Sequence, residues 1–332
     1  NEARDRYAPQ SDVVFAQHHW PVWGQTRIMD YLAKQRDVYK YLHDQTLRLI
    51  NHGFKSTEIA EQLTLPRSLE QEWSVRGYYG TLSHNAKSIY QRYIGWYDAN
   101  PAHLNPLPPS ERSAKLVAYM GGADAALTKA REDFNQGEYR WVAEIMTEVI
   151  FANPANQEAR GLAADAMEQL GYQAESATWR NAYLQGAHEL RQGLPQTLMR
   201  APVSPDVINA LTAPLFFDYL AVRLNGPKAE GKHMVINWMF PDVSERYMLN
   251  LENCALTYLA DHTAADAQVT VTLDRPALSQ LVLRQQTLDD AMDRGAITIE
   301  GDVSKLRELF ELIDDFLFLF DILEPHRQSP LP

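Results

Sequence analysis

The sequence predicts a multidomain chain of three parts: a short strand-bearing segment, an all-helical domain and an α+β domain. Apolar residues recur with a period near 3.6 through most of residues 25–193. Strand-like alternation of apolar and polar residues is concentrated after residue 205, and proline-rich stretches interrupt the pattern near residues 100 and 200. The predicted domains are therefore 1–24, 25–195 and 205–327.

Composition places the chain among ordinary globular proteins. Of its 332 residues, 45% are hydrophobic and 22% are charged. The net charge of −12 argues against a nucleic-acid partner, which needs clustered Lys and Arg. The single cysteine, Cys254, excludes an intrachain disulfide and a cysteine-cluster metal site. We expect no membrane span, because no apolar run reaches the roughly 18 residues that a spanning helix needs.

The first segment contains the motif "DVVFAQHHWPVWG" at residues 12–24. Its apolar run predicts a short buried strand that ends at His18 and His19. Polar groups just past strand ends are where α/β folds place ligand and catalytic groups, and histidine is the commonest metal ligand. The other histidines show no ligand spacing such as H-x-H or H-E-x-x-H. Either the pair is structural, or its partner ligands lie on sequence outside this chain.

Three amphipathic stretches open the helical domain. We expect one helix that ends at Gly53, a short helix capped by Ser56 or Thr57 and followed by Pro66, and a third that stops before Pro101. The proline-containing stretch that follows marks a boundary or a hinge.

A faint repeat follows in residues 131–176. It has a Gly-x-Tyr turn, an amphipathic helix, an Asn-Pro break and a second helix that ends in Leu-Gly-Tyr. This punctuation is typical of tetratricopeptide-like helix pairs. It predicts either plain helical packing, against neighbours or another subunit, or a specific peptide groove.

The pattern changes to that of an α+β domain after a second linker at residues 191–206. We expect a helix over 208–226 and a strongly apolar helix from Ser304 to about Leu323. Strands are predicted at 233–240, 246–253, 255–262, 268–274 and 296–302. The two helices are apolar enough to wall a cavity for an aliphatic chain, although core helices of a small domain would look the same. Gly301 and Asp302 predict a strand-to-helix turn and a helix cap.

Five motifs between about residues 10 and 325 resemble, in the same order, the C-terminal portion of the bacterial zinc-dependent alkyl sulfatases. They are "FAQHHWPVWG", "RGYYGTLSHNAKSIYQRYIGWYDANP", "YMGGADAAL", "NQGEYRWVAEIM" and "AMEQLGYQAES". In that family, a metallo-β-lactamase-type catalytic domain precedes an all-helical dimerisation domain and a sterol-carrier-like domain. The resemblance implies that residues 1–24 are the C-terminal edge of the catalytic domain. The H-x-H-x-D-H motif, which supplies most zinc ligands in the family, is absent, and we expect it upstream of Asn1.

The resemblance also assigns roles to the two histidines. In metallo-β-lactamase folds a late strand ends in a histidine that ligates the second metal ion. Where relatives read "H-G-P-x-W", this chain reads "HWPVW" from His19, which makes His19 the implied metal ligand. His18 is then a catalytic residue beside the ligand or on the substrate side.

The stretch "RGYYGTLSHNAKSIYQRY" carries candidate sulfate-binding groups. Sulfate esters are anionic and have several acceptor oxygens, which match the donors of Arg76 and of tyrosine hydroxyls. The alternative is a helix N-terminus with a tyrosine-rich packing face. In the family this segment is expected to reach over the catalytic pocket, which implies that Arg76, Tyr79, His84 and Tyr90 bind substrate.

The function that the resemblance implies is hydrolysis of alkyl sulfates to an alcohol and inorganic sulfate. Two zinc ions, shared with an upstream segment, are expected to activate water and polarise the sulfate oxygens. The expected partners are the alkyl sulfate, a second copy of the chain in a homodimer, and the upstream catalytic segment. We expect a periplasmic or secreted protein. The alternative function is a non-enzymatic helical dimerisation and lipid-carrier protein, because this chain alone encodes no complete catalytic centre.

Overall fold

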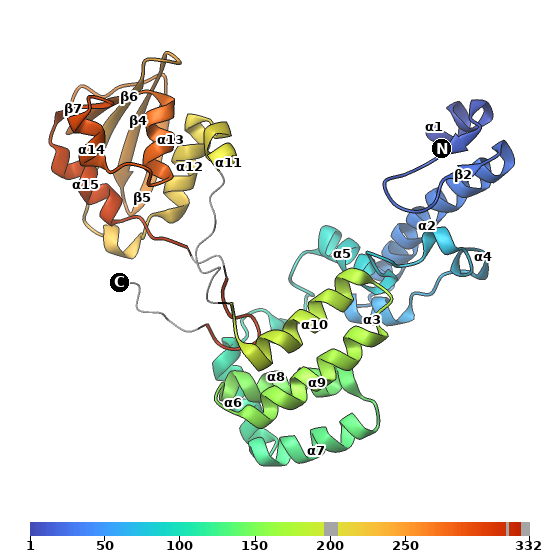
Figure 1. The fold of residues 1–332 in the computed structure, drawn as a ribbon. Coiled ribbons are helices and arrows are strands. Elements are labelled where there is room, and N and C mark those ends of the chain that lie inside the picture. Colours follow the sequence, from blue (N-terminus) through green and yellow to red (C-terminus); the bar gives the residue numbers. More distant parts are fainter. Residues whose placement is uncertain (196–204, 317–318, 327–332) are drawn as a thin grey trace. The chain divides into compact units, whose positions relative to one another are not determined.

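The structure, a computed structural model, describes residues 1–195, 205–316 and 319–326 (Figure 1). It divides into two compact units, each with its own core. The helical unit comprises Asn1–Leu194 together with the described residues from Asp321 on, and the C-terminal unit comprises the described residues between them. The predicted third domain ran on to residue 327, whereas the structure assigns its last residues to the helical unit. Most of the predicted linker at 191–206 lies outside the described residues.

The chain begins with a small helical turn and a hairpin rather than a buried strand. Strands β1 (Val13–Val14) and β2 (Val22–Trp23) pair antiparallel, and both histidines lie in the loop between them. The prediction of a buried strand that ends at the histidines is wrong: the apolar run forms only the two-residue strand β1, whose partly buried Val14 packs against the small core of Ala8, Val22 and Ile28. Phe15 is accordingly 76% exposed. Before the hairpin lie α1 (Glu2–Arg6) and η1 (Ala8–Gln10).

Five elements follow the hairpin and form the first helical layer. They are α2 (Gln25–Asn51), α3 (Ser56–Gln62), α4 (Arg67–Glu70), η2 (Trp73–Val75) and α5 (Leu82–Ile94). Their shared core is aliphatic and includes Leu42, Leu49 and Ile59. The stop of α2 before Gly53 is confirmed, since that glycine has φ 87°.

Two boundary predictions in this layer are wrong. The residue that caps α3 is Lys55, whose backbone N–H donates to the Glu58 carboxylate at 2.7 Å, so Ser56 and Thr57 are already helical. Helix α5 ends before Gly95, six residues ahead of Pro101 (101 − 95). Gly95 has φ 86°, which a helix cannot continue through.

The second helical layer is built on small residues. Its helices are α6 (Pro109–Tyr119), α7 (Ala123–Asn135), α8 (Tyr139–Ala152), α9 (Gln157–Gln173) and α10 (Ala177–Gln192), preceded by η3 (Pro101–His103). Alanines dominate the core between them, so neighbouring helices approach closely; α9 and α10 lie side by side (Figure 1). A Cβ at Gly171 would lie 2.9 Å from the Leu184 side chain. The predicted end of this helix at Leu-Gly-Tyr is confirmed, since α9 ends at Gln173, and Gly171 also lets α10 approach closely.

Residues 321–326 pack against helices α9 and α10 of this layer. The Glu324 carboxylate forms a buried ion pair with Arg160, and the Glu189 carboxylate accepts the backbone N–H groups of Ile322 and Leu323 at 2.9 and 3.2 Å. Leu323 adds an apolar contact to the alanine-rich core. The C-terminal segment is thus an integral part of the helical unit.

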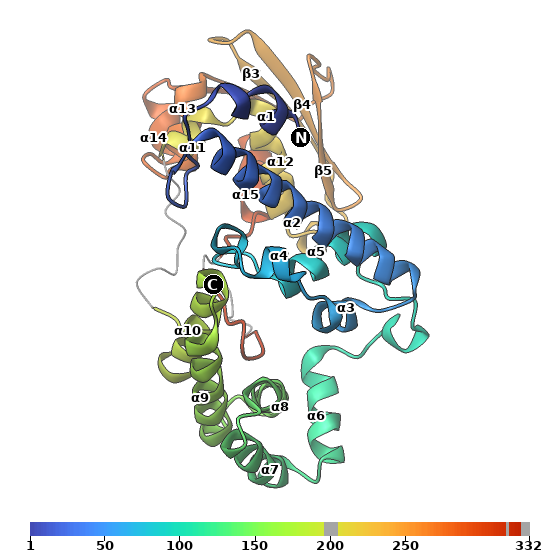
Figure 2. The ribbon, with the colours of Figure 1, turned by 90° about the vertical axis from the view of Figure 1, so that its right-hand side faces the viewer.

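The C-terminal unit is a five-stranded sheet with helices gathered on one face (Figures 1 and 2). Its strands are β3 (Met234–Phe240), β4 (Glu245–Glu252), β5 (Ala255–Ala260), β6 (Val269–Leu273) and β7 (Ile297–Gly301), in the order β5-β4-β3-β6-β7. Only β3 and β6 pair parallel among these neighbours. All five predicted strands are confirmed. Alternate burial along β6 fits a sheet with one covered face.

The helices of this unit depart from prediction in two places. They are α11 (Pro205–Ala210), α12 (Ala213–Arg223), η5 (Pro227–Ala229), α13 (Arg275–Val282), α14 (Leu288–Asp293) and α15 (Val303–Glu311). The single helix predicted over 208–226 is two helices, because Thr212 caps a new one. The apolar helix predicted to reach Leu323 ends at Glu311, where Ile313 instead bridges to Leu224.

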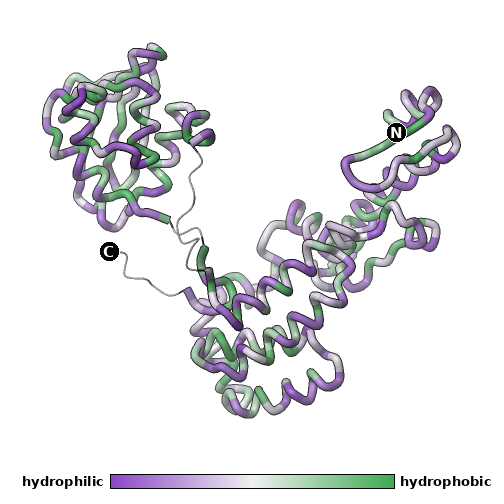
Figure 3. Tube along the Cα trace, viewed as in Figure 1, coloured by the Kyte–Doolittle hydropathy of each residue, from purple (hydrophilic) through white to green (hydrophobic). Residues whose placement is uncertain are grey.

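Hydrophilic and hydrophobic residues alternate along most helices of the chain (Figure 3). Among the residues that the structure describes, none of the helices has the length and apolar character needed to cross a membrane.

Candidate functional site

Two segments far apart in sequence meet at the hairpin loop. The imidazole Nδ1 of His18 lies 3.3 Å from the hydroxyl of Tyr79, and their ring centroids are 4.8 Å apart. Both side chains are exposed. The sequence assigned these two residues to the site from separate motifs, and the structure brings them into contact.

His19 occupies a different environment from its neighbour. Its φ of 71° lies in the left-handed region, so the loop turns sharply here instead of continuing as a strand. The ring packs edge-on against Trp73 at 5.3 Å and beside Tyr78 at 5.6 Å, centroid to centroid. No hydrogen bond to its ring nitrogens occurs within the described part of the chain. Those nitrogens can therefore serve an external ligand.

Two glycines shape the turn that presents Tyr78 and Tyr79. A Cβ at Gly77 would lie 2.8 Å from the carbonyl oxygen of Gly80, and one at Gly80 would lie 2.9 Å from the Asn85 side chain. A larger residue at Gly77 would therefore open this turn, because the atom it would meet belongs to the backbone. Helix α5 begins directly after it, where Thr81 accepts the backbone N–H of His84 at 2.9 Å.

The start of α10 contacts this turn from the other side. The hydroxyls of Ser176 and Thr178 both donate to the carbonyl oxygen of Tyr79, and the Ala177 N–H donates to the carbonyl of Tyr78 at 2.8 Å. Sequence reasoning missed these residues. Ser176 at a helix start was a readable cap signal, but nothing in the sequence told which distant turn it would face.

Two side-chain contacts complete this arrangement. Arg76 pairs with Glu175 at 2.7 Å, and the indole N–H of Trp179 donates to Nδ1 of His84 at 3.3 Å. The Arg76–Glu175 pair is about half exposed, so solvent screens it strongly.

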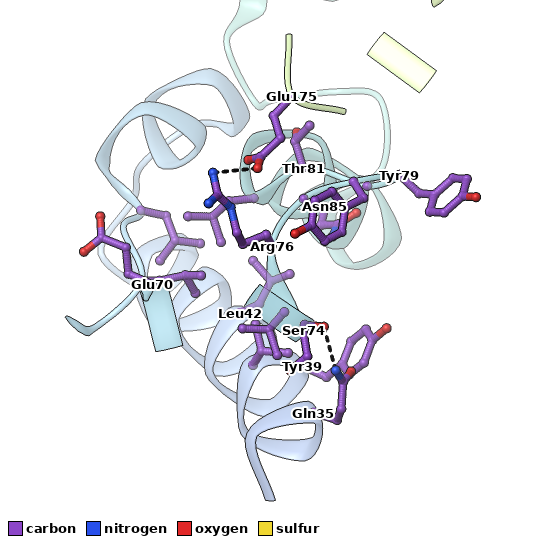
Figure 4. Close-up of a pocket in the computed structure, with 18 of the residues that line it drawn as sticks. Gln35, Tyr39, Leu42, Glu70, Ser74, Arg76, Tyr79, Thr81, Asn85 and Glu175 are labelled. Carbon is purple, nitrogen blue, oxygen red and sulfur yellow. Dashed lines mark hydrogen bonds and ion pairs between the residues drawn. The ribbon is translucent and has the colours of Figure 1, made fainter. Parts of the chain in front are cut away.

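A cavity of about 840 Å³ lies between α2, the turn and the start of α10 (Figure 4). Figure 4 shows Arg76 reaching toward Glu175 and the Tyr79 ring pointing out of the cavity. Its lining combines polar groups with aliphatic side chains, among them His19, Arg76, Asn85, Leu42, Leu63 and Leu82.

Four predicted site residues are thus brought together: His18, His19, Arg76 and Tyr79. The His84 ring instead contacts Trp179, near the start of α10. Tyr90 does not line the cavity; it is 6% exposed and packs in the aliphatic core, because it lies one turn after Ala86 on the inward face of α5. Tyr90 is therefore a packing residue of α5, which agrees with the alternative of a tyrosine-rich packing face.

A complete metal centre does not fit the described residues. Among them no group of three His, Cys, Asp or Glu side chains is placed to hold a metal ion. A structural or catalytic zinc needs at least three protein ligands. The exposed imidazole of His19 fits the chemistry of a single ligand and no more.

Comparison with known proteins gives the chain its relatives. Residues 55–193 match the family model described as alkyl sulfatase dimerisation, and residues 201–325 match the one described as alkyl sulfatase C-terminal. The alkyl/aryl-sulfatase of Saccharomyces cerevisiae is 54% identical over 97% of the chain, and a linear primary-alkylsulfatase of a Pseudomonas species is 48% identical over 98%. The chain spans 50% and 48% of these two proteins, about half of each.

A solved structure agrees with these relatives. The stereoselective inverting secondary alkylsulfatase from a Pseudomonas species is 44% identical, covers 98% of the chain with 51% of its own length, and superposes with a TM-score of 0.92.

Proposed function

Since the chain belongs to the alkyl sulfatase family, as a part that carries the dimerisation and C-terminal domains, we propose that it completes the active site of an enzyme that hydrolyses alkyl sulfates. The observation that carries the proposal is the contact of His18 with Tyr79, beside His19 and the cavity that contains Arg76. The products would be an alcohol and inorganic sulfate.

The sulfate group would bind to hydrogen-bond donors of the turn. The Tyr79 hydroxyl is exposed and can donate to a sulfate oxygen while its other side meets His18. Arg76 is paired with Glu175, but an exposed ion pair contributes about 1 kcal/mol or less. A sulfate oxygen can therefore replace or share the carboxylate as the partner of the guanidinium.

His18 is proposed as the catalytic residue of this chain. Its imidazole lies where it can touch a group held by Tyr79, and histidine can donate or accept a proton near neutral pH. The ring contact with Tyr79 also fixes the direction of the phenol.

We propose His19 as one ligand of a zinc centre whose other ligands come from outside this chain. The unpaired ring nitrogens of His19 within the described structure support this role. Bound zinc would supply an activated water and polarise sulfate oxygens. The finer fold assignments belong to the same proposal: residues 1–24 as an edge of a metallo-β-lactamase-type domain, and the C-terminal unit as sterol-carrier-like.

We also propose a homodimer, in line with the family model matched by residues 55–193. The periplasmic or secreted location stays a prediction.

The test is hydrolysis of dodecyl sulfate by the full-length zinc-loaded enzyme. Tyr79→Phe and Arg76→Ala should each lower kcat/KM by about tenfold or more, since each removes a hydrogen bond to a charged group. Two matched controls, Tyr93→Phe and Arg131→Ala, remove the same groups from exposed positions elsewhere in the helical unit and should stay within about twofold of the wild type. A wild-type enzyme without sulfatase activity would refute the proposal, as would site variants that match their controls.

A further inference from the structure

Five consecutive residues, Glu175–Trp179, each contact the segment that carries the proposed site. Glu175 pairs with Arg76, and the next three residues donate to the carbonyl oxygens of Tyr78 and Tyr79. The contact made by Trp179 is to the ring of His84. All five residues therefore contact one short segment that lies nearly a hundred residues earlier in the chain (175 − 76 = 99).

The hydroxyl contacts restrain the Tyr79 carbonyl more than one bond would. A single donor satisfies a carbonyl oxygen, whereas two donors from different directions fix its orientation. Ser176 is 2% exposed, and its Oγ also lies 2.9 Å from the Thr178 hydroxyl. The peptide plane that follows Tyr79 is thereby restrained, and with it the backbone position from which the exposed phenol projects.

Trp179 orients His84 in a second way. An indole nitrogen can only donate, so the Nδ1 of His84 is the acceptor in this contact, which orients the ring toward Trp179. Lys87 lies over the Trp179 ring at 5.9 Å and adds a cation–π contact that keeps the indole in place.

A role limited to stability would not explain the pattern. Thr178 and Glu175 are exposed, and exposed hydrogen bonds and ion pairs contribute little to the free energy of unfolding. Their partners, in contrast, are the residues proposed to bind substrate.

We propose that Glu175–Trp179 is the positioning element of the site, which holds Arg76, the Tyr78–Tyr79 backbone and the His84 ring in the arrangement that binds the sulfate group. This inference rests on the proposed sulfatase function. It adds to that function a set of residues that act through others and need not touch the substrate.

The experiment uses the full-length zinc-loaded enzyme and dodecyl sulfate. The double variant Ser176→Ala/Thr178→Val removes both donors to Tyr79, and a displaced binding group costs roughly 10- to 100-fold in kcat/KM. The rescue pair Ser176→Thr/Thr178→Ser keeps both hydroxyls and should recover most of this loss. Hydrogen exchange of the peptide that covers residues 76–84 should become faster in the double variant and not in the rescue variant.

Asn156→Ala is the control for a merely structural effect. Asn156 caps α9 by accepting the N–H of Ala159 at 3.0 Å, as Ser176 caps α10, but within the described structure its side chain does not bond to the turn. It should lower the melting temperature by a similar amount while kcat/KM stays within about twofold of the wild type. Equal losses of kcat/KM in Asn156→Ala and the double variant, or a double variant with wild-type kinetics, would overturn the inference.

A failure of the proposed sulfatase function can be distinguished from a failure of the positioning role. A wild-type enzyme that does not hydrolyse dodecyl sulfate would refute the function, and the positioning role with it. Hydrogen exchange would still report, in that case, whether the five residues restrain the turn.

Discussion

The two units differ in where they place large aromatic side chains: the helical unit exposes tryptophan side chains, and the C-terminal unit buries an aromatic cluster. In the helical unit, Trp20, Trp23, Trp96 and Trp141 are all exposed, and the cores consist mainly of aliphatic residues and alanine, with Tyr90 as a buried aromatic. In the C-terminal unit five large aromatic side chains are buried together: Phe216, Phe217, Trp238, Phe240 and Tyr247.

This difference separates two tasks. The C-terminal unit uses its aromatic residues to stabilise itself, since each buries a large apolar area. The helical unit is stabilised by close packing of small residues and leaves rings and polar groups at its surface, where the proposed site lies. Substitutions of the same type should therefore affect stability in one unit and function in the other.

The largest expected effect tests this contrast directly. Trp238→Ala should lower the free energy of unfolding of the C-terminal unit by about 3–5 kcal/mol, because the side chain is 1% exposed and its removal leaves a cavity. Trp141→Ala, the matched control on the surface of the helical unit, should change stability by about 0.5 kcal/mol or less. Urea unfolding measures both. Similar losses in the two variants would remove the contrast.

The next effect concerns a buried polar contact in the helical unit. Arg160→Ala removes a buried guanidinium that pairs with the Glu324 carboxylate and donates to the carbonyl of Leu190, which should cost about 3 kcal/mol. Arg131→Ala breaks an exposed pair with Glu158 and should cost under about 1 kcal/mol. Thermal melts of the helical unit compare them. A neutral Arg160→Ala would contradict the place given to residues after 320.

High pH should destabilise the C-terminal unit selectively. Burial, and then the hydrogen bond to Glu245, raise the pKa of Tyr247 from 10.0 to about 12. The unfolded tyrosine ionises first, so this stabilisation is complete below pH 10 and is lost as the pH rises to about 12. Tyr247→Phe should flatten unfolding free energy against pH in that window. An unchanged slope would exclude Tyr247 as its source.

Low pH should have the smallest effect, at two helix starts of the same unit. Hydrogen bonds from the side chain and backbone of Thr287 hold the pKa of Asp290 below 3.8, and those of Ser304 do the same for Asp302. Their stabilisation is present above that pH and is lost as the pH falls through the lowered values. Asp290→Asn and Asp302→Asn should make the acid limb of the melting-temperature profile shallower, whereas Asp293→Asn should leave it unchanged.

The sequence predicted the C-terminal sheet well and the ends of several helices less well. Strands such as β3 and β6 are visible because one face is buried, which forces alternation. The end of α15 depended on the distant partner of Ile313, and the end of α5 on a glycine rather than a proline. Such outcomes depend on tertiary contacts or on local φ, which periodicity does not reveal.

The candidate site was predictable in its groups and not in its geometry. His18, His19, Arg76 and Tyr79 stood out by residue type and by family resemblance. The opposing residues Glu175–Trp179 carried no chemical signal, because their role lies in hydroxyl and backbone donors that many helix starts share. Tyr90 looked like the other tyrosines until its place on the inward face of α5 was known.

The central claim is that the hairpin loop supplies His19 to the metal centre of a sulfatase. The most direct measurement is the zinc content of the purified full-length His19→Ala enzyme, with dodecyl sulfate turnover measured on the same sample. The exposed His52→Ala variant serves as the matched control. We predict that His19→Ala loses about one zinc ion per chain and nearly all turnover, whereas His52→Ala keeps both. Full zinc content and full turnover in His19→Ala would contradict the claim.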